Sequence, residues 1–188
     1  MVTANLVTGV PGSGKSTVAR ELSRRGFFAI DADEDESLAG WINIGRTEAS
    51  PLTALSEWCA THRWQWNPTH LAHLIASSGD EALFVCGGAA NLDDLAGSFA
   101  NIVGLEIDVD TLAERLDAID RASGVATADG DTRDQISQWL PRDQQHLREL
   151  GAVMIDGRQS IEQVTSTVLV ETSSPKFPHG RSRFFHSH

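Results

Sequence analysis

Residues 9–16, GVPGSGKS, are the stretch that most restricts what this chain can fold into. They match the pattern G-x-x-x-x-G-K-[ST], in which glycines let backbone N–H groups turn inward and approach phosphate oxygens without a side-chain clash. The lysine places a positive charge near the β and γ phosphates, and the serine hydroxyl is a ligand for Mg²⁺. An apolar run precedes the motif and an amphipathic stretch follows it, so the motif predicts a triphosphate-binding loop between a strand and a helix. The residues that we expect to hold the nucleotide are Gly9, Pro11, Gly12, Ser13, Gly14, Lys15, Ser16 and Thr17.

Apolar runs alternate with helical patterns along the rest of the chain. We expect strands at residues 3–8, 27–33, 81–89, 101–109 and 152–156, and helices at 15–25, 111–119, 134–150 and 160–170. Thr111 with Glu114 and Ser160 with Gln163 are capping-box pairs, which should open two of these helices. Strands that alternate with helices predict an α/β fold, in which helices cover both faces of a five-stranded parallel sheet in a three-layer sandwich.

Four segments fall outside this alternation. Residues 34–50 are typical of a loop or short helix, and residues 51–78 carry helical patterning. Residues 121–133 are polar and rich in Gly, Ala and Asp, which predicts a mobile loop. Residues 173–188 contain no acidic residue and change composition abruptly, so we interpret them as a flexible tail or an expression remnant. The folded domain is therefore expected over residues 1–172.

The second expected strand runs into two carboxylates, Asp31 and Asp33. In a parallel sheet, the carboxyl end of this strand lies near the rim of the phosphate-binding loop. We expect Asp31 to face the water shell of Mg²⁺ and Asp33 to accept or orient the proton of a substrate hydroxyl. The alternative is a solvated acidic turn, which we favour for the remaining acidic residues of this stretch, Glu34, Asp35 and Glu36.

Taken together, GVPGSGKST, a strand ending in DAD, a strand ending in CGGAA and the stretch LEIDVDTLAERL resemble the small P-loop kinases of the nucleoside- and shikimate-kinase type. The resemblance spans about residues 3–170, and within this superfamily the chain resembles bacterial proteins loosely labelled AAA-family ATPase or shikimate-kinase-like. It implies a P-loop NTPase fold with a mobile lid, ATP and Mg²⁺ as co-substrates, and transfer of the γ-phosphoryl group to a small acceptor. It also implies that Asp31 and Asp33 serve metal and acceptor, and that Gly87, Gly88 and Ala89 line the acceptor pocket.

The segment after the DAD pattern departs from several members of that superfamily. Shikimate kinases bind the carboxylate of their substrate through arginines in this region, and adenylate-kinase-like enzymes bind a monophosphate there in the same way. Arg46 and Arg63 are the only arginines between this pattern and the third expected strand. Polynucleotide kinases share a PGSGKS loop, but Asp33 is not followed by the arginine of their pattern. The identity of the acceptor therefore stays open.

Phosphoryl transfer requires positive charge over the γ-phosphate, which small kinases usually supply from a lid. The loop at residues 121–133 occupies the place of such a lid, and Arg121 and Arg133 bracket it. We expect one of these two arginines to close over the γ-phosphate, with Arg142 and Arg148 on the following helix as weaker candidates. Arg158, just after the fifth strand, is placed to stack on adenine. The alternative for each is a solvated surface position.

Trp64 and Trp66 lie two residues apart in the stretch HRWQW. On a helix their side chains would diverge, whereas on an extended segment they would share a face. Clustered indoles indicate either core packing beneath the acceptor region or an aromatic wall of the acceptor pocket, and we favour packing.

The formal net charge of −11 at pH 7 disfavours nucleic acid as a partner, because an acidic surface repels phosphate backbones. No apolar run approaches the roughly 20 residues of a membrane helix, and the N-terminus lacks a basic leader. Two cysteines, Cys59 and Cys86, do not make a disulfide framework, and Cys86 lies in an apolar run typical of a buried thiol. We expect a cytoplasmic protein with no membrane contact, and the sequence leaves its oligomeric state open.

These features predict an ATP- and Mg²⁺-dependent phosphotransferase that acts on a hydroxyl or phosphate of a small molecule. Two acidic residues in the expected lid, Asp129 and Asp131, suit a triphosphate poorly and favour another class, a nucleotide-binding switch that hydrolyses slowly and acts through a protein partner. A third reading is a polynucleotide 5′-kinase, which requires salt-sensitive binding of oligonucleotides. The motif binds phosphates rather than bases, so it does not distinguish ATP from GTP.

Overall fold

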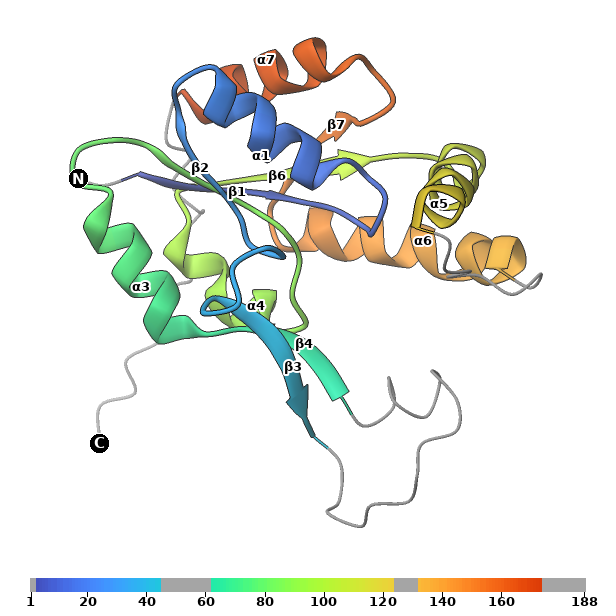
Figure 1. Cartoon of the computed structure of the whole chain (residues 1–188), viewed down its shortest axis with the longest axis horizontal. Helices are drawn as coiled ribbons and strands as arrows, with labels where there is room; N and C mark the ends of the chain where they lie inside the picture. Colours follow the sequence, from blue (N-terminus) through green and yellow to red (C-terminus); the bar gives the residue numbers. More distant parts are fainter. Residues whose placement is uncertain (1–2, 45–61, 124–131, 174–188) are drawn as a thin grey trace, which may run out of the picture.

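The computed structural model describes residues 3–44, 62–123 and 132–173. Five parallel strands form the main sheet in the order β2-β5-β1-β6-β7 (Figure 1). They are β1 (Ala4–Thr8), β2 (Phe28–Asp31), β5 (Leu83–Cys86), β6 (Asn101–Glu106) and β7 (Val153–Asp156). The predicted five-stranded parallel sheet is therefore confirmed. A second sheet pairs β3 (Ala39–Asn43) with β4 (His62–Trp66) in antiparallel orientation.

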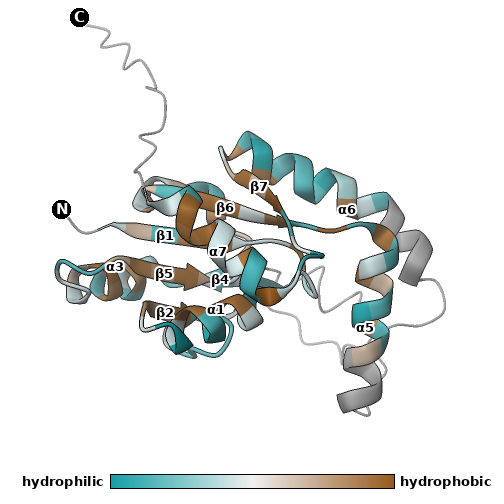
Figure 2. Cartoon of the chain, turned by 90° about the horizontal axis from the view of Figure 1, so that it is seen from above, coloured by the Kyte–Doolittle hydropathy of each residue, from teal (hydrophilic) through white to brown (hydrophobic). Residues whose placement is uncertain are grey.

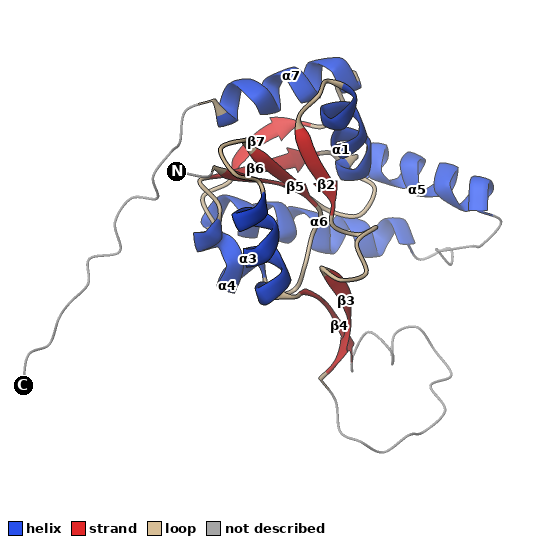
Figure 3. Ribbon diagram, turned by 60° about the vertical axis from the view of Figure 1, so that its left-hand side comes forward, coloured by secondary structure: helices blue, strands red, loops and turns tan. Residues whose placement is uncertain are grey.

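Helices lie on both sides of the main sheet, which confirms the three-layer arrangement. The helices α1 and α7 cover one face, and α3, α4 and α6 lie across the other (Figure 3). The described helices are α1 (Lys15–Arg24), α3 (Pro68–Ser77), α4 (Leu92–Leu95), α5 (Val109–Ser123), α6 (Thr132–Glu149) and α7 (Ile161–Thr172), with a 3₁₀ turn at Ala96–Ser98.

The central strands β1 and β5 are buried along their whole length, and this explains their nearly continuous apolar sequence. Successive side chains of β1 point to opposite sides: Leu6 packs with Leu71 of α3 in one core cluster, and Val7 packs with Val168 of α7 in another. Figure 2 shows this distribution, with hydrophobic strands between helices whose outer surfaces are largely hydrophilic. The sheet is thus held in place from both sides.

The hairpin of β3 and β4 corrects two predictions. Residues 39–43 are a strand rather than a loop or short helix, and residues 62–66 are a strand rather than part of a helix. The antiparallel register sets Trp41 opposite Trp64, with ring centroids 5.6 Å apart in an edge-to-face arrangement, and cross-strand aromatic pairs of this kind stabilise sheets. In the described part of the second segment, helix α3 starts at Pro68, where the side chain of Asn67 caps it. The remainder of the two segments, residues 45–61, lies outside the described part of the chain.

The boundaries of α5 and α6 also differ from the prediction. The side chain of Asp108 accepts the N–H of Thr111 at 2.7 Å, so α5 starts at Val109 and Thr111 is not its capping residue. Because α5 continues to Ser123 and α6 begins at Thr132, the ends of the expected lid loop are helical, and its centre, residues 124–131, lies outside the described residues. The capping box of Ser160 and Gln163 at the start of α7 is confirmed.

Cys86 is a buried free thiol, as expected, whereas Cys59 falls outside the described residues. Helix α7 ends at Thr172, next to the predicted domain boundary, which stays a prediction because residues 174–188 are not described. None of the helices in the described ranges is long and apolar enough to cross a membrane.

Asn91 joins the hairpin to the main body and generates a first prediction. Its Nδ2 donates to the carbonyl oxygen of Trp66 at 2.9 Å, and its Oδ1 accepts the N–H of the same residue at 3.0 Å. The Asn91→Ala variant leaves both partly buried groups without a partner, so we expect the free energy of unfolding to fall by about 1–3 kcal/mol in urea denaturation. Asn91→Asp keeps the acceptor and loses the donor, and should fall between wild type and Ala. An unchanged urea midpoint in Asn91→Ala would contradict this role.

Candidate active site

The loop between β1 and α1 depends on two glycines for its shape. Gly9 has a φ of 154°, and a Cβ at this position would lie only 3.0 Å from the carbonyl oxygen of Leu105. Gly14 has a φ of 108° and caps α1 in the left-handed region, which residues with side chains rarely adopt. One glycine therefore allows a close approach to β6, and the other allows the turn that starts α1 at the loop. The positive end of a helix at such a loop attracts anions.

Lys15 is the first residue of α1, and only 8% of it is exposed. Its Nζ donates to the carbonyl oxygen of Val10 at 3.1 Å, so the side chain folds back over the loop. Burial lowers the pKa of the ammonium group, and the negative charges of Asp33 and Asp31 oppose this effect. The ammonium thus lies near the loop on one side and two carboxylates on the other, where it can neutralise an added phosphate.

Arg115 on α5 is a functional residue that the sequence reasoning missed. Its Nη1 donates to the carbonyl oxygens of Ser13 at 2.9 Å and Gly12 at 3.3 Å, and its Nη2 donates to that of Gly157 at 2.8 Å. Since C=O and N–H of a trans peptide point in opposite directions, holding the Ser13 carbonyl turns the N–H of Gly14 away from Arg115. The arginine is visible in the stretch LAERL, but the carbonyl groups that it binds are about 40 and 100 residues away in the sequence.

The two carboxylates at the end of β2 lie in different surroundings. Strand β2 ends at Asp31, and the chain then turns, so Asp33 is on the turn and its N–H donates to Oδ1 of Asp31 at 3.2 Å. Oδ2 of Asp31 is buried and has no hydrogen-bond partner among the described residues. Oδ1 of Asp33 accepts the indole N–H of Trp64 at 3.2 Å. Removal from water raises the pKa of Asp33, although Lys15 and Trp64 act in the opposite direction.

The turn after β5 lies beside Asp33, and its role in binding an acceptor stays a prediction. A Cβ added at Gly87 would lie 3.6 Å from Oδ1 of Asp33 and 2.8 Å from the indole ring of Trp66, so the turn leaves no room for a side chain there. The next residues continue along the loop to Ala90, whose N–H donates to the carbonyl oxygen of Trp64 at 2.7 Å. The loops after β2 and β5 and the strand β4 therefore meet at one place.

A cavity of about 720 Å³ lies over the phosphate-binding loop and reaches Asp33, whereas Asp31 and the turn Gly87–Ala89 are not part of its lining. Its lining includes residues 11–18 of the loop and α1, together with Asp33, Arg115, Gly157 and Gln159. Of the residues predicted to hold the nucleotide, those that line the same cavity as Asp33 are Pro11, Gly12, Ser13, Gly14, Lys15, Ser16 and Thr17. Gly9, at the start of the loop, packs against the backbone of β6 instead.

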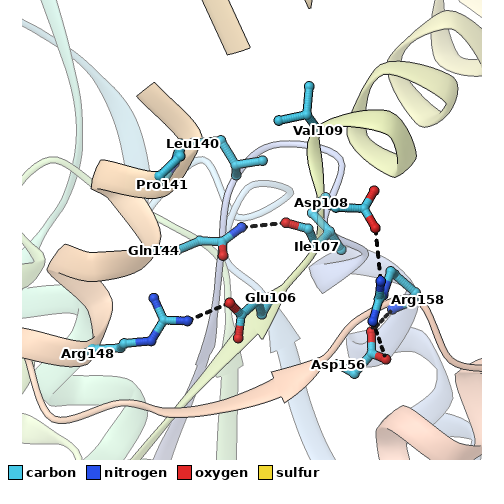
Figure 4. Close-up of a pocket in the computed structure, with 10 residues that line it drawn as sticks. All are labelled: Glu106, Ile107, Asp108, Val109, Leu140, Pro141, Gln144, Arg148, Asp156 and Arg158. Carbon is cyan, nitrogen blue, oxygen red and sulfur yellow. Dashed lines mark hydrogen bonds and ion pairs between the residues drawn. The ribbon is translucent and has the colours of Figure 1, made fainter. Parts of the chain in front are cut away.

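Arg158 lines a second cavity, of about 450 Å³, between the ends of β6 and β7 and α6 (Figure 4). Its guanidinium pairs with Asp108 at 2.9 Å and with Asp156 at 2.8 Å. Arg148, one of the weaker lid candidates, also lies here and pairs with Glu106. The neighbours of Arg158 in the sequence line the first cavity, so stacking of Arg158 on adenine stays a prediction.

The lid arginines are only partly placed by the structure. Arg121 belongs to α5 and Arg133 to α6, so the two residues lie near the helix ends that flank residues 124–131. Their side chains are not among those described, and the prediction that one of them closes over a phosphate stays open. Arg142 lies on the exposed surface of α6.

Comparisons with known proteins bear on the family and the fold of the chain. A family model described as AAA domain matches residues 6–120, more than half of the chain. Among solved structures, a gluconokinase from Sinorhizobium meliloti 1021 is 18% identical with a TM-score of 0.50, and the match covers 91% of each chain. A deoxyadenosine kinase from M. mycoides is 10% identical with a TM-score of 0.52, over 93% of this chain and 100% of that one. No curated protein sequence matches significantly. The chain therefore has the fold of small P-loop kinases, as the sequence motifs indicated.

The Arg115 contacts lead to a prediction about nucleotide binding. A lysine at this position cannot reach three carbonyl oxygens at once, because it offers one point charge instead of a planar fork. We expect Arg115→Lys to weaken binding of a non-hydrolysable ATP analogue roughly tenfold in calorimetry, the effect of losing about one charged hydrogen bond. Arg24→Lys is a matched control, since Arg24 is exposed on α1 and pairs with Glu21. Equal affinity in Arg115→Lys and wild type would contradict the role of Arg115.

The raised pKa of Asp33 leads to a prediction about stability. The folded protein holds the Asp33 proton more tightly than the unfolded chain does, so the ionised carboxylate lowers stability above its folded pKa and has no such effect below about pH 4. Asp33→Asn keeps the oxygen that accepts from Trp64 and removes the charge. We expect this variant to melt at a higher temperature than wild type at pH 7, with a difference that shrinks as the pH falls toward 4. A lower melting temperature at pH 7 would contradict the burial argument.

Proposed function

The chain belongs to the AAA domain family, and from this membership we propose that it is an ATP- and Mg²⁺-dependent phosphotransferase with a small-molecule acceptor. The observation that carries the proposal is that Lys15, Ser16 and Asp33 line one cavity. Phosphoryl transfer needs a loop that binds the triphosphate and a carboxylate that orients the acceptor, held close to each other. The gluconokinase and the deoxyadenosine kinase share this fold and are both kinases, which supports the proposal.

The nucleotide phosphates would lie on the loop at the start of α1. Backbone N–H groups around Gly12 and Gly14, the helix N-terminus and the ammonium of Lys15 all offer positive charge to the same place. Lys15 would exchange the carbonyl of Val10 for the β and γ phosphates, whose negative charge would offset the effect of burial on its ammonium group. Arg115 keeps the loop in the shape that this binding requires.

The residues present fit a Mg²⁺ ion. The hydroxyl of Ser16 and the carboxylate of Asp31 would hold it, because both offer the oxygen ligands that Mg²⁺ prefers. Oδ2 of Asp31 is buried without a donor among the described residues, and a buried oxygen in this state is stabilised when a cation or its water shell supplies the missing interaction. When bound, Mg²⁺ would offset the negative charge that develops on the phosphates.

The acceptor would lie between Asp33 and the turn formed by Gly87, Gly88 and Ala89. Asp33 orients the acceptor and takes its proton, and its raised pKa brings the carboxylate closer to the range in which a base works well. We propose that Arg121 or Arg133 closes over the transferred group, because α5 and α6 place them on the two sides of the connecting segment. Arg158 would offer its planar guanidinium to the base of the nucleotide.

ATP consumption with Mg²⁺, measured without and with pooled acceptors, tests this proposal. Lys15→Ala should abolish acceptor-dependent transfer while circular dichroism shows an intact fold, because it removes the ammonium that neutralises the phosphates. Lys176→Ala is the matched control, as Lys176 is the only other lysine of the chain. Transfer at the normal rate in Lys15→Ala would overturn the assignment.

The same experiment separates the proposal from the other reading of the sequence. Tight ATP binding by calorimetry, with slow turnover that no acceptor stimulates, would identify a nucleotide-binding switch that acts through a protein partner. Acceptor-stimulated turnover that is lost in Lys15→Ala would identify a kinase, and dividing the pool would then name the acceptor.

A further inference from the structure

Asp33 is held by a tryptophan of the β3–β4 hairpin, a contact that the transfer reaction described above does not by itself explain. The indole N–H of Trp64 donates to Oδ1 of Asp33 at 3.2 Å. An indole nitrogen only donates, so this bond assigns Oδ1 as an acceptor and keeps the proton of a neutral Asp33 on the other oxygen. No described residue donates a hydrogen bond to Oδ2 of Asp33, which is therefore the oxygen available to a bound molecule.

Trp64 is itself fixed from three directions. The register of the hairpin sets it against Trp41, whose ring packs edge-to-face on it. Its carbonyl oxygen accepts the N–H of Ala90, and two residues further on Asn91 bonds both backbone groups of Trp66. Trp64 also packs against the core cluster that contains Trp66, which is 2% exposed. The donor is therefore presented by a rigid support rather than by a mobile side chain.

The charges around this contact indicate which acceptors fit. Residues 31–36 carry five carboxylates, whereas the described residues 37–44, 62–67 and 86–91 contribute one arginine, Arg63. Its Nη1 donates to the carbonyl oxygen of the adjacent His62. Lys15, whose charge also acts on Asp33, would be neutralised by the triphosphate in the proposed function. An acceptor that bears a phosphate or carboxylate would then meet net negative charge here, at a cost that grows as water is excluded. A hydroxyl on an uncharged or cationic molecule meets no such cost.

We propose that Trp64 is a positioning residue that orients Asp33 as the base for an alcohol acceptor, one that carries no phosphate or carboxylate group. In this step the acceptor oxygen bonds to Pγ and the bond from Pγ to the β–γ bridging oxygen breaks. ADP leaves, and the hydroxyl proton goes to Oδ2 of Asp33. A phosphate acceptor attacks through an oxygen that is already deprotonated near neutral pH, so it does not need a general base such as Asp33. The inference rests on the proposed kinase function and narrows its acceptor.

The first arm of the test compares matched acceptors on the wild-type protein. Pairs such as a nucleoside and its monophosphate, or a sugar and its phosphate, differ only in the anionic group. Turnover that the alcohols stimulate and their phosphates do not is the expected result. Stimulation by the phosphorylated members alone would overturn this inference while leaving the kinase assignment in place. No acceptor-dependent turnover at all would instead overturn the proposed function.

The second arm tests the contact. Trp64→Phe keeps the ring and removes the donor, and we expect kcat to fall roughly tenfold, with little change in KM for ATP. Trp139→Phe makes the same chemical change on α6, in a different core cluster, and should leave kcat near wild type. In an Asp33→Asn background, Trp64→Phe should have no further effect on kcat, since it acts through that carboxylate. Full additivity of the two changes would overturn the positioning role.

A third measurement does not depend on whether Trp64→Phe folds. The indole Nε1–H resonances of the ¹⁵N-labelled protein report the hydrogen bond directly. The Trp64 resonance should move upfield in Asp33→Asn, because a neutral amide oxygen is a weaker acceptor than a carboxylate. An unchanged Trp64 resonance would contradict the bond in solution and with it the inference.

Discussion

Three backbone carbonyl oxygens converge on the guanidinium of Arg115, and the geometry of the whole nucleotide side follows from that convergence. Two of them belong to the loop after β1 and the third to the loop after β7. The C=O and N–H of each peptide unit point in opposite directions, so a residue that holds the outer carbonyls also fixes the direction of the inner N–H groups. Arg115 holds these carbonyls from α5, so one side chain joins three separate elements of the fold around the phosphate site.

The order of the strands explains why the phosphate-binding loop and the proposed acceptor side meet. Strands β2, β5 and β1 are neighbours, and parallel pairing brings their carboxyl ends to one edge of the sheet. Asp33 follows β2, Gly87 follows β5 and Gly9 follows β1, so residues about 25 to 80 positions apart in the chain occupy one rim. The two core clusters on opposite faces of the sheet hold that rim rigid, which is a requirement for aligning two reacting groups.

Much of this arrangement could be predicted from the sequence because its signals are local. Strands buried on both faces show as short apolar runs, and the phosphate loop requires glycines and a lysine at fixed spacing. The hairpin could not be predicted in the same way, since tryptophans at alternate positions are compatible with a helix until the cross-strand partner of Trp64 is known. Arg115 and Arg158 have partners that only the folded chain brings near, so the sequence does not distinguish them from other surface arginines.

The hairpin and the phosphate loop are attached to the rest of the protein through different contacts. Asn91 and Ala90 hold the hairpin to the loop after β5, whereas Arg115 holds the phosphate loop to α5 and to Gly157. Among the described residues the two sets share no side chain, and Asp33 lies between them, bonded to Trp64 and within the electrostatic reach of Lys15. In the proposed function, a substitution in the hairpin would therefore change the surroundings of the acceptor while the contacts that hold the phosphate loop stay in place. A single carboxylate lies at the boundary between a part that can vary and a part that must keep its shape.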